Sequence, residues 1–411
     1  MRRDGGDKHD PAYQGETTVR LAAVGQREVR GSRSRRRRRS RRRRGGVLLL
    51  AVVLLLAALA GGAFYVYRSM IATPDFPGPG EGHVVVKVRD GDTTRAIGEQ
   101  LARAGVVAAP ASFTEAAAGS DRIRSVQPGY YQLKRQMSGA GAVTLLLDPA
   151  SRLGQLDIRG GVQLDDTRAP DGAVTPGVLS QIANATCHAV DGARTCLSAD
   201  DLRAAMSATN PAQLGVPEWA RDAVSKAPPE RRLEGLLLPG RYDVEPGAPA
   251  VKVLQDLVTT SAARIEETGL LTGAEKIGMS PYQMLVIASL VEKESITPDM
   301  PKVARVIYNR LGAGQRLELD TTINYPLDVP SLFTSPVNRA RPGPYNTYLN
   351  TGLPVTPIAA AGSDALHAAL TPADGPWMFF VPCEKDGTSC FAVTFAEHQK
   401  NVQQAHQDGV F

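Results

Sequence analysis

The hydrophobic pattern is clearest over residues 280–295, where apolar residues recur at helical spacing. Ser280 and Pro281 have the order of a helix cap followed by a first helical residue, and Gln283 is placed to return a hydrogen bond to the cap. At about 100° per residue, four apolar side chains fall on one stripe: Met284, Ile287, Leu290 and Val291. Glu294 falls inside the same stripe, so the pattern predicts a carboxylate among apolar neighbours.

Glu294 carries the main candidate chemistry. A carboxyl group flanked by apolar side chains loses hydration, which disfavours its charged form and raises its pKa toward about 6, where it donates a proton near neutrality. This is the profile of a general acid. The alternative is a glutamate at the frayed helix end, partly solvated or paired with Arg305 or Arg310. Helical phase alone does not decide between the two.

The remaining pattern predicts an α+β protein built from short elements. Five segments have the composition of strands: 84–88, 129–131, 143–147, 156–158 and 316–322. Five others have helical spacing or helix start and stop signals: 94–104, 198–207, 217–225, 250–268 and 301–311. Residues 342–357 hold too many prolines and glycines for either element. A long structured loop rich in Asn, Thr and Tyr often carries function.

An uncharged run of 21 residues, Val47 to Tyr67, has the length and composition of a helix that spans a bilayer. Aromatic residues at its end suit the membrane interface. A cleaved signal peptide is the competing interpretation, but its apolar core would be shorter, about 7 to 15 residues, and nearer the N-terminus. We therefore expect a single-pass anchor in the cell membrane.

The formal net charge of +5 hides an asymmetry, because residues 1–46 hold 16 Arg or Lys and 5 acidic residues and the rest of the chain is at about −6. An arginine run from Arg33 to Arg44 beside a membrane helix predicts a cytoplasmic N-terminus, with everything after about Arg68 outside. Its expected partners are anionic lipid head groups rather than nucleic acid, the alternative that such a run also suggests. Residues 1–46 are expected to form a disordered tail.

The four cysteines form two close pairs, Cys187 with Cys196 and Cys383 with Cys390. In an exported protein, two local disulfides are the simplest arrangement. A metal site using Cys187, His188 and Cys196 is the alternative, but no CxxC motif or histidine cluster supports it. We expect no metal and no cofactor.

Composition divides the chain into five parts: a tail at 1–46, the span at 47–67, a Pro/Gly-rich linker at 68–82, a small module at 83–150 and a larger domain at 151–411. With 43% hydrophobic residues, the chain can bury a sizeable core. No P-loop, dinucleotide fingerprint, HExxH or GxSxG motif occurs in the sequence. Functions that depend on those motifs lose their usual support.

Six segments resemble, in the same order, the endolytic murein transglycosylases of the MltG or YceG-like family. They are EGLLLPGRY at 234–242, LVIASLVEKES at 285–295, VARVIYNRL at 303–311, RLELDTT at 316–322, YNTYLNTGLPVTPIAAAG at 345–362 and FAEHQKNV at 395–402. Together they are a specific signal, although each is weak alone. Residues from His83 to about Leu147 resemble the family's LysM-like module more faintly, and the arginine-rich N-terminus suggests an actinobacterial type.

The resemblance implies a catalytic role for Glu294, which matches the second glutamate of the family's EKE triplet. The implied substrate is the glycan strand of peptidoglycan, cut internally between MurNAc and GlcNAc to leave a 1,6-anhydroMurNAc end and terminate elongation. Such a lytic reaction uses the sugar's own 6-hydroxyl as nucleophile, so one carboxyl can act first as acid and then as base. The implied partners are peptidoglycan strands and the peptidoglycan synthesis machinery, met by an extracellular catalytic domain.

The loop segment that matches the family supplies further candidates for substrate binding. Asn346, Thr347 and Tyr348 are placed to hydrogen-bond sugar amides and hydroxyls, and Tyr345 offers a stacking face. A purely loop-stabilising role is the alternative for all four.

Three carboxylates outside the EKE triplet complete the candidate site. Glu234 is expected at the cleft, and Asp320 either orients substrate or forms an ion pair with Arg316 or Arg341. Glu318 stands where the family usually has glutamine. Two rival functions stay open: a hydrolase with Asp320 or Glu318 as base, which needs two carboxyls about 5 to 9.5 Å apart, and a non-catalytic wall-binding scaffold.

Overall fold

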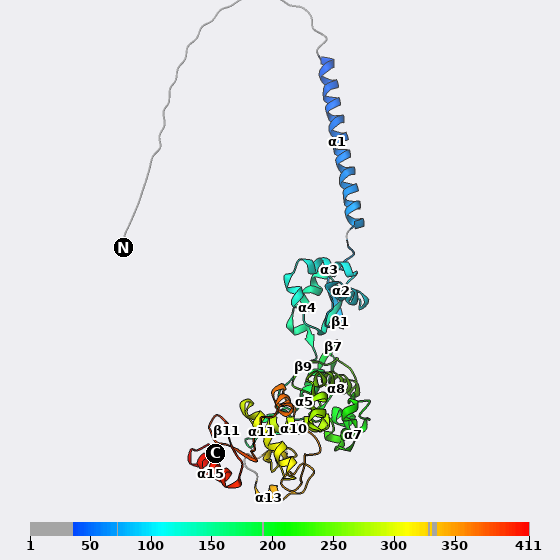
Figure 1. Cartoon of the computed structure of the whole chain (residues 1–411). Coiled ribbons are helices and arrows are strands. Elements are labelled where there is room, and N and C mark those ends of the chain that lie inside the picture. Colours follow the sequence, from blue (N-terminus) through cyan, green and yellow to red (C-terminus); the bar gives the residue numbers. More distant parts are fainter. Residues whose placement is uncertain (1–35, 72, 191–192, 328, 331–334, 411) are drawn as a thin grey trace, which may run out of the picture. The chain divides into compact units, whose positions relative to one another are not determined.

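The computed structural model describes residues 36–71, 73–190, 193–327, 329–330 and 335–410. The chain divides into two compact units, Met1–Ala72 and Thr73–Phe411. The first unit contains helix α1, Arg36–Ile71, which is drawn in blue in Figure 1. Its apolar stretch Leu48–Tyr67 is long enough to cross a bilayer and is exposed on all sides.

Two predicted boundaries in the N-terminal region need correction. Helix α1 begins at Arg36, so the disorder predicted for residues 1–46 is wrong for the last part of that range; residues 1–35 lie outside the described residues. Arginine is a good helix former, and an existing helix extends into it at low cost. The predicted linker 68–82 is also too long, because strand β1 already begins at Pro79.

The second unit begins with two strands and three helices that share a core of their own. The elements are β1 Pro79–Val88, α2 Thr94–Arg103, α3 Pro110–Ala118, β2 Gly129–Met137 and α4 Gly139–Leu146. Strands β1 and β2 pair antiparallel, and the helices cover them (Figure 1). Leu101, Phe113 and Leu133 are fully buried between the layers. The predicted strands at 84–88 and 129–131 and the helix at 94–104 are confirmed, although both strands are longer.

Residues 143–147, predicted as a strand, are mostly the end of helix α4. Ser138 caps this helix by accepting a backbone N–H of its first turn, and Val143 and Leu146 lie in the core. A short apolar run does not distinguish a buried strand from a buried helix. The polar cap decides it here.

The rest of the second unit is mainly helical, with short antiparallel ladders. The strands are β3 Arg152–Leu153, β4 Gln155–Ile158, β5 Thr167–Arg168, β6 Val174–Thr175, β7 His188–Val190, β8 Ala193–Thr195, β9 Gly240–Asp243, β10 Phe379–Pro382 and β11 Ser389–Ala392. The helices are α5 Val178–Thr186, α6 Ala199–Ala208, α7 Glu218–Lys226, α8 Ala250–Glu267, α9 Leu270–Ile277, α10 Pro281–Glu294, α11 Met300–Gly312, α12 Asp320–Asn324, α13 Pro336–Arg339, α14 Ser363–Leu370 and α15 Phe395–Gln407.

Four predicted helices and one predicted strand of this region are confirmed to within a residue or two: α6, α7, α8, α11 and β4. Strand β4 pairs with β9, and β3 joins β2 as the third strand of the first sheet. The mixed content agrees with the predicted α+β class.

Helix α10 runs through the larger core, where it packs against α7, α9, α11 and α14. All of its residues from Met284 to Val291 are buried, so the predicted single apolar stripe is wrong: the helix is enclosed on every side. A helix with so few polar residues along its middle is stable only in such surroundings. The buried Ser289 hydroxyl in its middle donates to the Val286 carbonyl and accepts the N–H of Ile358.

Residues 316–322, predicted as a strand, form an irregular segment followed by the start of helix α12. Leu317 and Leu319 are buried and alternate with polar residues, which gives the segment the period of a strand. Its backbone N–H groups have no strand as partner, because Thr347 of the long loop accepts two of them. The prediction of an irregular loop at 342–357 is confirmed.

Both predicted disulfides are present. Cys187 bonds to Cys196 around the β7–β8 hairpin, and Cys383 bonds to Cys390 across the β10–β11 hairpin. Their sulfurs are therefore not metal ligands here. Within the described ranges, no group of three or more His, Cys, Asp or Glu side chains is arranged to hold a metal ion.

Candidate active site

The sequence of α10 fixes the position of Glu294 from both ends of the helix. The Ser280 hydroxyl accepts the N–H of Gln283 at 3.2 Å, and the Gln283 side chain accepts the N–H of Ser280 at 2.9 Å, which is the predicted capping box. The helix ends at Glu294 because Ser295 adopts an extended backbone with φ of −148°. The enclosed middle of the helix allows little movement, so the last side chain is presented in a defined direction.

Glu294 combines partial exposure with poor hydration. Burial of its carboxyl raises the pKa from 4.5 to about 7, and the nearby negative charge of Asp320 adds to this rise. The Thr321 hydroxyl donates a hydrogen bond to Oε1, which favours the charged form and lowers the pKa in part. The net result is a pKa near neutrality, which suits a general acid.

The two arginines considered as partners of Glu294 are engaged elsewhere. Arg305 donates to the Ala373 carbonyl at 2.5 Å and lies 3.4 Å from the Asp374 carboxylate. Arg310 lies 3.2 Å from the Glu318 carboxylate and donates to backbone carbonyls. The ion-pair interpretation of Glu294 is therefore wrong.

Glu318, the partner of Arg310, has a left-handed backbone, with φ of +52°.

The residues beside Glu294 tie the helix end to two glycine-containing turns. Glu292 accepts the N–H of Gly362 at 3.0 Å, and Lys293 donates to the Gly161 carbonyl at 3.2 Å. Gly160 leaves room for the Glu292 carboxyl, since a Cβ there would lie 2.4 Å from its Oε1. Sequence reasoning missed this role for the first two residues of the EKE triplet, because the partners lie far away in the chain.

Asp320 begins helix α12, directly before the threonine that touches Glu294. Its carboxylate accepts the Tyr348 hydroxyl at 2.7 Å and lies 3.3 Å from the Arg339 guanidinium. The ion-pair partner is thus Arg339, not Arg316 or Arg341 as expected. Asp320 and Tyr348 keep partly exposed surfaces, so this pair borders the Glu294 site.

The other three loop candidates point into the protein. The Tyr345 hydroxyl is 3.0 Å from the Thr356 hydroxyl, and the Asn346 amide donates to two backbone carbonyls. Thr347 bonds to the Thr322 hydroxyl at 2.8 Å. Their relative exposures are only 4%, 5% and 2%, so their positions agree with the loop-stabilising alternative rather than with sugar contact.

Glu234 lies in the interior, not at a cleft surface. It is 2% exposed, accepts the Leu164 N–H at 3.0 Å and accepts the Tyr325 hydroxyl at 2.7 Å. Burial raises its pKa to about 7, while those two hydrogen bonds lower it in part. Tyr325 directly follows α12, so Glu234 anchors one end of the helix whose other end meets Glu294.

The fold and this site can be compared with known proteins. A family model described as the YceG-like family matches residues 86–404. This chain belongs to that family. Its Glu294 site, Glu234 anchor and long loop all lie inside the matched range, and the family predicted from the six segments is confirmed.

Two relatives extend the comparison. An endolytic murein transglycosylase of Bacillus subtilis strain 168 is 31% identical over 170 residues, which are 41% of this chain and 46% of that protein. The chain therefore spans about half the length of this curated relative. The 2.6 Å crystal structure of a YceG-like protein from Listeria monocytogenes covers 77% of this chain and 98% of its own, with a TM-score of 0.50 and 24% identity. That likeness concerns the fold alone.

Proposed function

We propose that this YceG-like protein is an endolytic peptidoglycan lytic transglycosylase with Glu294 as its catalytic residue. The observation that carries the proposal is a single carboxyl at a helix end, titrating near neutrality, with a hydroxyl donor on one oxygen. The name of the Bacillus subtilis relative, an endolytic murein transglycosylase, supports the same reaction. The substrate would be the glycan strand, cut between MurNAc and GlcNAc.

One carboxyl is sufficient for this reaction. Protonated Glu294 gives its proton to the bridging oxygen as the bond from that oxygen to C1 of MurNAc breaks. The 6-hydroxyl oxygen of the same sugar then bonds to C1, and its proton returns to the Glu294 carboxylate. No water is consumed, so the product ends in 1,6-anhydroMurNAc and the enzyme regains its starting state.

The remaining candidates take different roles in this proposal. Asp320 and Tyr348 border the site and supply polar contacts for the sugar, because both keep partly exposed surfaces. Tyr345, Asn346 and Thr347 hold the loop that carries Tyr348. Glu234 supports α12 from inside the protein.

The other regions suit an enzyme that works on nascent wall outside the cell membrane. Helix α1 would anchor the chain as a single span, with the arginine-rich end cytoplasmic and near anionic lipids. The strand, two helices and strand of residues 79–137 support a LysM-like, glycan-binding module. Such a placement would bring the enzyme close to the peptidoglycan synthesis machinery.

Mass spectrometry of glycan fragments tests the reaction. The detergent-solubilised full chain is incubated with uncrosslinked peptidoglycan strands, and anhydro-ended fragments are expected from the wild type but not from Glu294→Gln. The matched control Glu275→Gln, an exposed position on α9, should cut normally. Reducing ends without the anhydro mass would point instead to a hydrolase, for which Asp320 is the base to test. Binding without any cutting by the wild type would point to a scaffold.

A further inference from the structure

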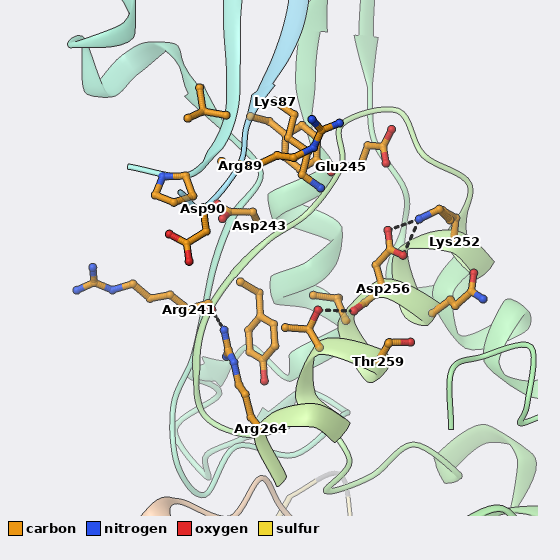
Figure 2. A pocket seen from close by; sticks show the side chains of 18 residues that line it. Lys87, Arg89, Asp90, Arg241, Asp243, Glu245, Lys252, Asp256, Thr259 and Arg264 are labelled. Carbon is orange, nitrogen blue, oxygen red and sulfur yellow. Dashed lines mark hydrogen bonds and ion pairs between the residues drawn. The ribbon is translucent and has the colours of Figure 1, made fainter. Parts of the chain in front are cut away.

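A large open cavity lies in the second unit, away from Glu294. Its volume is about 800 Å³, and its lining comes from the end of β1, the start of β2, strand β9 and helix α8. Figure 2 shows Lys87 and Arg89 at the top of the view and Arg241 and Arg264 lower down. Nothing in the proposed reaction uses this cavity, which we call the junction pocket.

The junction pocket has an excess of cations that are not neutralised within it. Two of its acidic residues already have a cation as partner. Asp243 lies 3.0 Å from Arg152, which is not part of the lining, and Asp256 pairs with Lys252 of the lining. Lys87, Arg89, Arg241 and Arg264 form no ion pair within the described part of the chain, and the other anions of the lining are Asp90 and Glu245. A ligand with several carboxylates and one amino group would complement this charge pattern.

The aromatic residues of the junction pocket argue against a sugar as ligand. Sugar rings are bound by stacking on open aromatic faces. The Lys87 ammonium lies 4.9 Å from the centre of the Tyr130 ring, and the Arg264 guanidinium lies 4.3 Å from the centre of the Tyr242 ring. Each ring has a cation over one face, and the two tyrosines are buried. The pocket therefore offers charge rather than an open stacking platform.

The junction pocket lies within reach of the Glu294 site. Arg241 pairs in register with Asp157 across the β4–β9 ladder. Three residues further, Gly160 lies against the Glu292 carboxyl. The path from Arg241 to the end of α10 is therefore roughly 15 Å, with about 5 Å across the ladder and about 10 Å along the chain at about 3.3 Å per residue. A peptide of about five residues spans at most roughly 18 Å. A peptide attached to a sugar at or next to Glu294 can therefore enter the pocket.

We propose that the junction pocket binds the carboxylate-bearing peptide stems that project from the glycan strand of peptidoglycan. Arg89 and Arg241, both exposed, would bind the stem carboxylates, and Asp90 or Glu245 would accept an amino group. This inference rests on the proposed function for its substrate. It adds that the enzyme recognises whether a strand carries peptides.

A binding measurement tests the pocket without any cutting. The probe is the free stem peptide released from peptidoglycan by an amidase, titrated calorimetrically into the detergent-solubilised full chain carrying Glu294→Gln. Adding Arg89→Gln and Arg241→Gln should weaken binding at least tenfold. The matched control Arg124→Gln with Lys276→Gln removes two exposed cations outside the pocket and should leave binding unchanged. Equal affinity for both double variants would overturn the proposal.

A cutting assay with two substrates separates this inference from the proposed function. The double variant Arg89→Gln with Arg241→Gln keeps Glu294 intact. It should raise KM at least tenfold for peptide-bearing strands. The same variant should cut peptide-free glycan like the wild type. An equal loss on both substrates would overturn the peptide site, whereas the absence of anhydro products from the wild type would refute the proposed reaction and leave the calorimetric result standing.

Discussion

Glu294 and Glu234 both have a pKa raised to about 7 by burial, but of these two only Glu294 keeps a partly exposed surface. The pKa of Glu294 rises because its carboxyl loses water, and the negative charge of Asp320 adds to the rise. Glu292, two residues earlier, accepts a backbone N–H and has a structural role. In the proposed reaction, the same residue type within one turn of helix serves chemistry at one position and architecture at the other.

Replacement of Glu294 by glutamine should stabilise the fold at alkaline pH. The unfolded glutamate loses its proton near pH 4.5 while the folded one keeps it to about pH 7. Because the folded state binds more protons in this window, wild-type stability falls as pH rises through it. Glu294→Gln should match the wild type below pH 4.5 and exceed it by up to roughly 3 kcal/mol at pH 8. Urea unfolding at both pH values measures this, with Glu275→Gln as control; an equal difference at both would contradict it.

Substitution Thr321→Val should move the alkaline limb of kcat/KM to higher pH. The Thr321 hydroxyl lowers the pKa of Glu294 by bonding to its charged form, so its removal raises that pKa further and keeps the acid protonated longer. The stability cost should be about 1 kcal/mol. A pH–rate profile checks the shift. Thr144→Val, which removes an exposed hydroxyl bonded to the Ala140 carbonyl, should leave the profile unchanged, and a shift toward lower pH for Thr321→Val would refute the argument.

At the scale of elements, two helices make the site. Helix α10 is held by its enclosed apolar body, and short α12 is held by its ends. Thr321 near the start of α12 meets Glu294, and Tyr325 just after its end donates to buried Glu234. A helix this short has little stability of its own, so its position depends on these anchors.

Loss of the Tyr325 hydroxyl should therefore affect catalysis as well as stability. Tyr325→Phe leaves buried Glu234 without one donor and should cost about 1–3 kcal/mol of unfolding free energy. It should also lower kcat and shift the pH profile, because α12 no longer holds Thr321 against Glu294. Tyr308→Phe is the matched control: its hydroxyl donates to the Ala369 carbonyl at 2.8 Å, away from α12. If both variants lost stability but kept the kcat and pH profile of the wild type, α12 would not position Glu294.

At the scale of the whole molecule, the two units have opposite solvent requirements. The apolar stretch of α1 exposes its side chains on all sides, whereas the second unit encloses two hydrophobic cores of its own. Such an uncovered apolar helix is unfavourable in water and favourable in a bilayer.

A chain that begins at Thr73 should consequently be water-soluble and folded. It retains both cores and both disulfides, so its thermal unfolding should remain cooperative and its kcat on soluble glycan should match that of the full chain. Detergent phase partitioning compares the two proteins, with the full chain expected in the detergent phase. A truncated chain that also entered the detergent phase would show that a surface other than α1 binds membranes.

The sequence by itself determined the features that depend on neighbours in the chain. The capping box at Ser280, the apolar run of α1, the two local disulfides and the main helices all follow from short-range spacing. The presence of helix α10 with Glu294 at its end was also readable, but the single apolar stripe read from its period was wrong, because neighbouring helices enclose α10 on every side. Short apolar runs such as 143–147 were ambiguous, since strand and helix bury them equally well.

Only the tertiary structure decided which polar groups are buried and what they bind. Glu234 meets Tyr325, Asp320 meets Arg339, and Thr347 replaces a partner strand for residues near Leu319. Each of these contacts joins segments separated by many residues. Hydrogen bonding and burial depend on distances in space, and local periodicity holds no information about such distances.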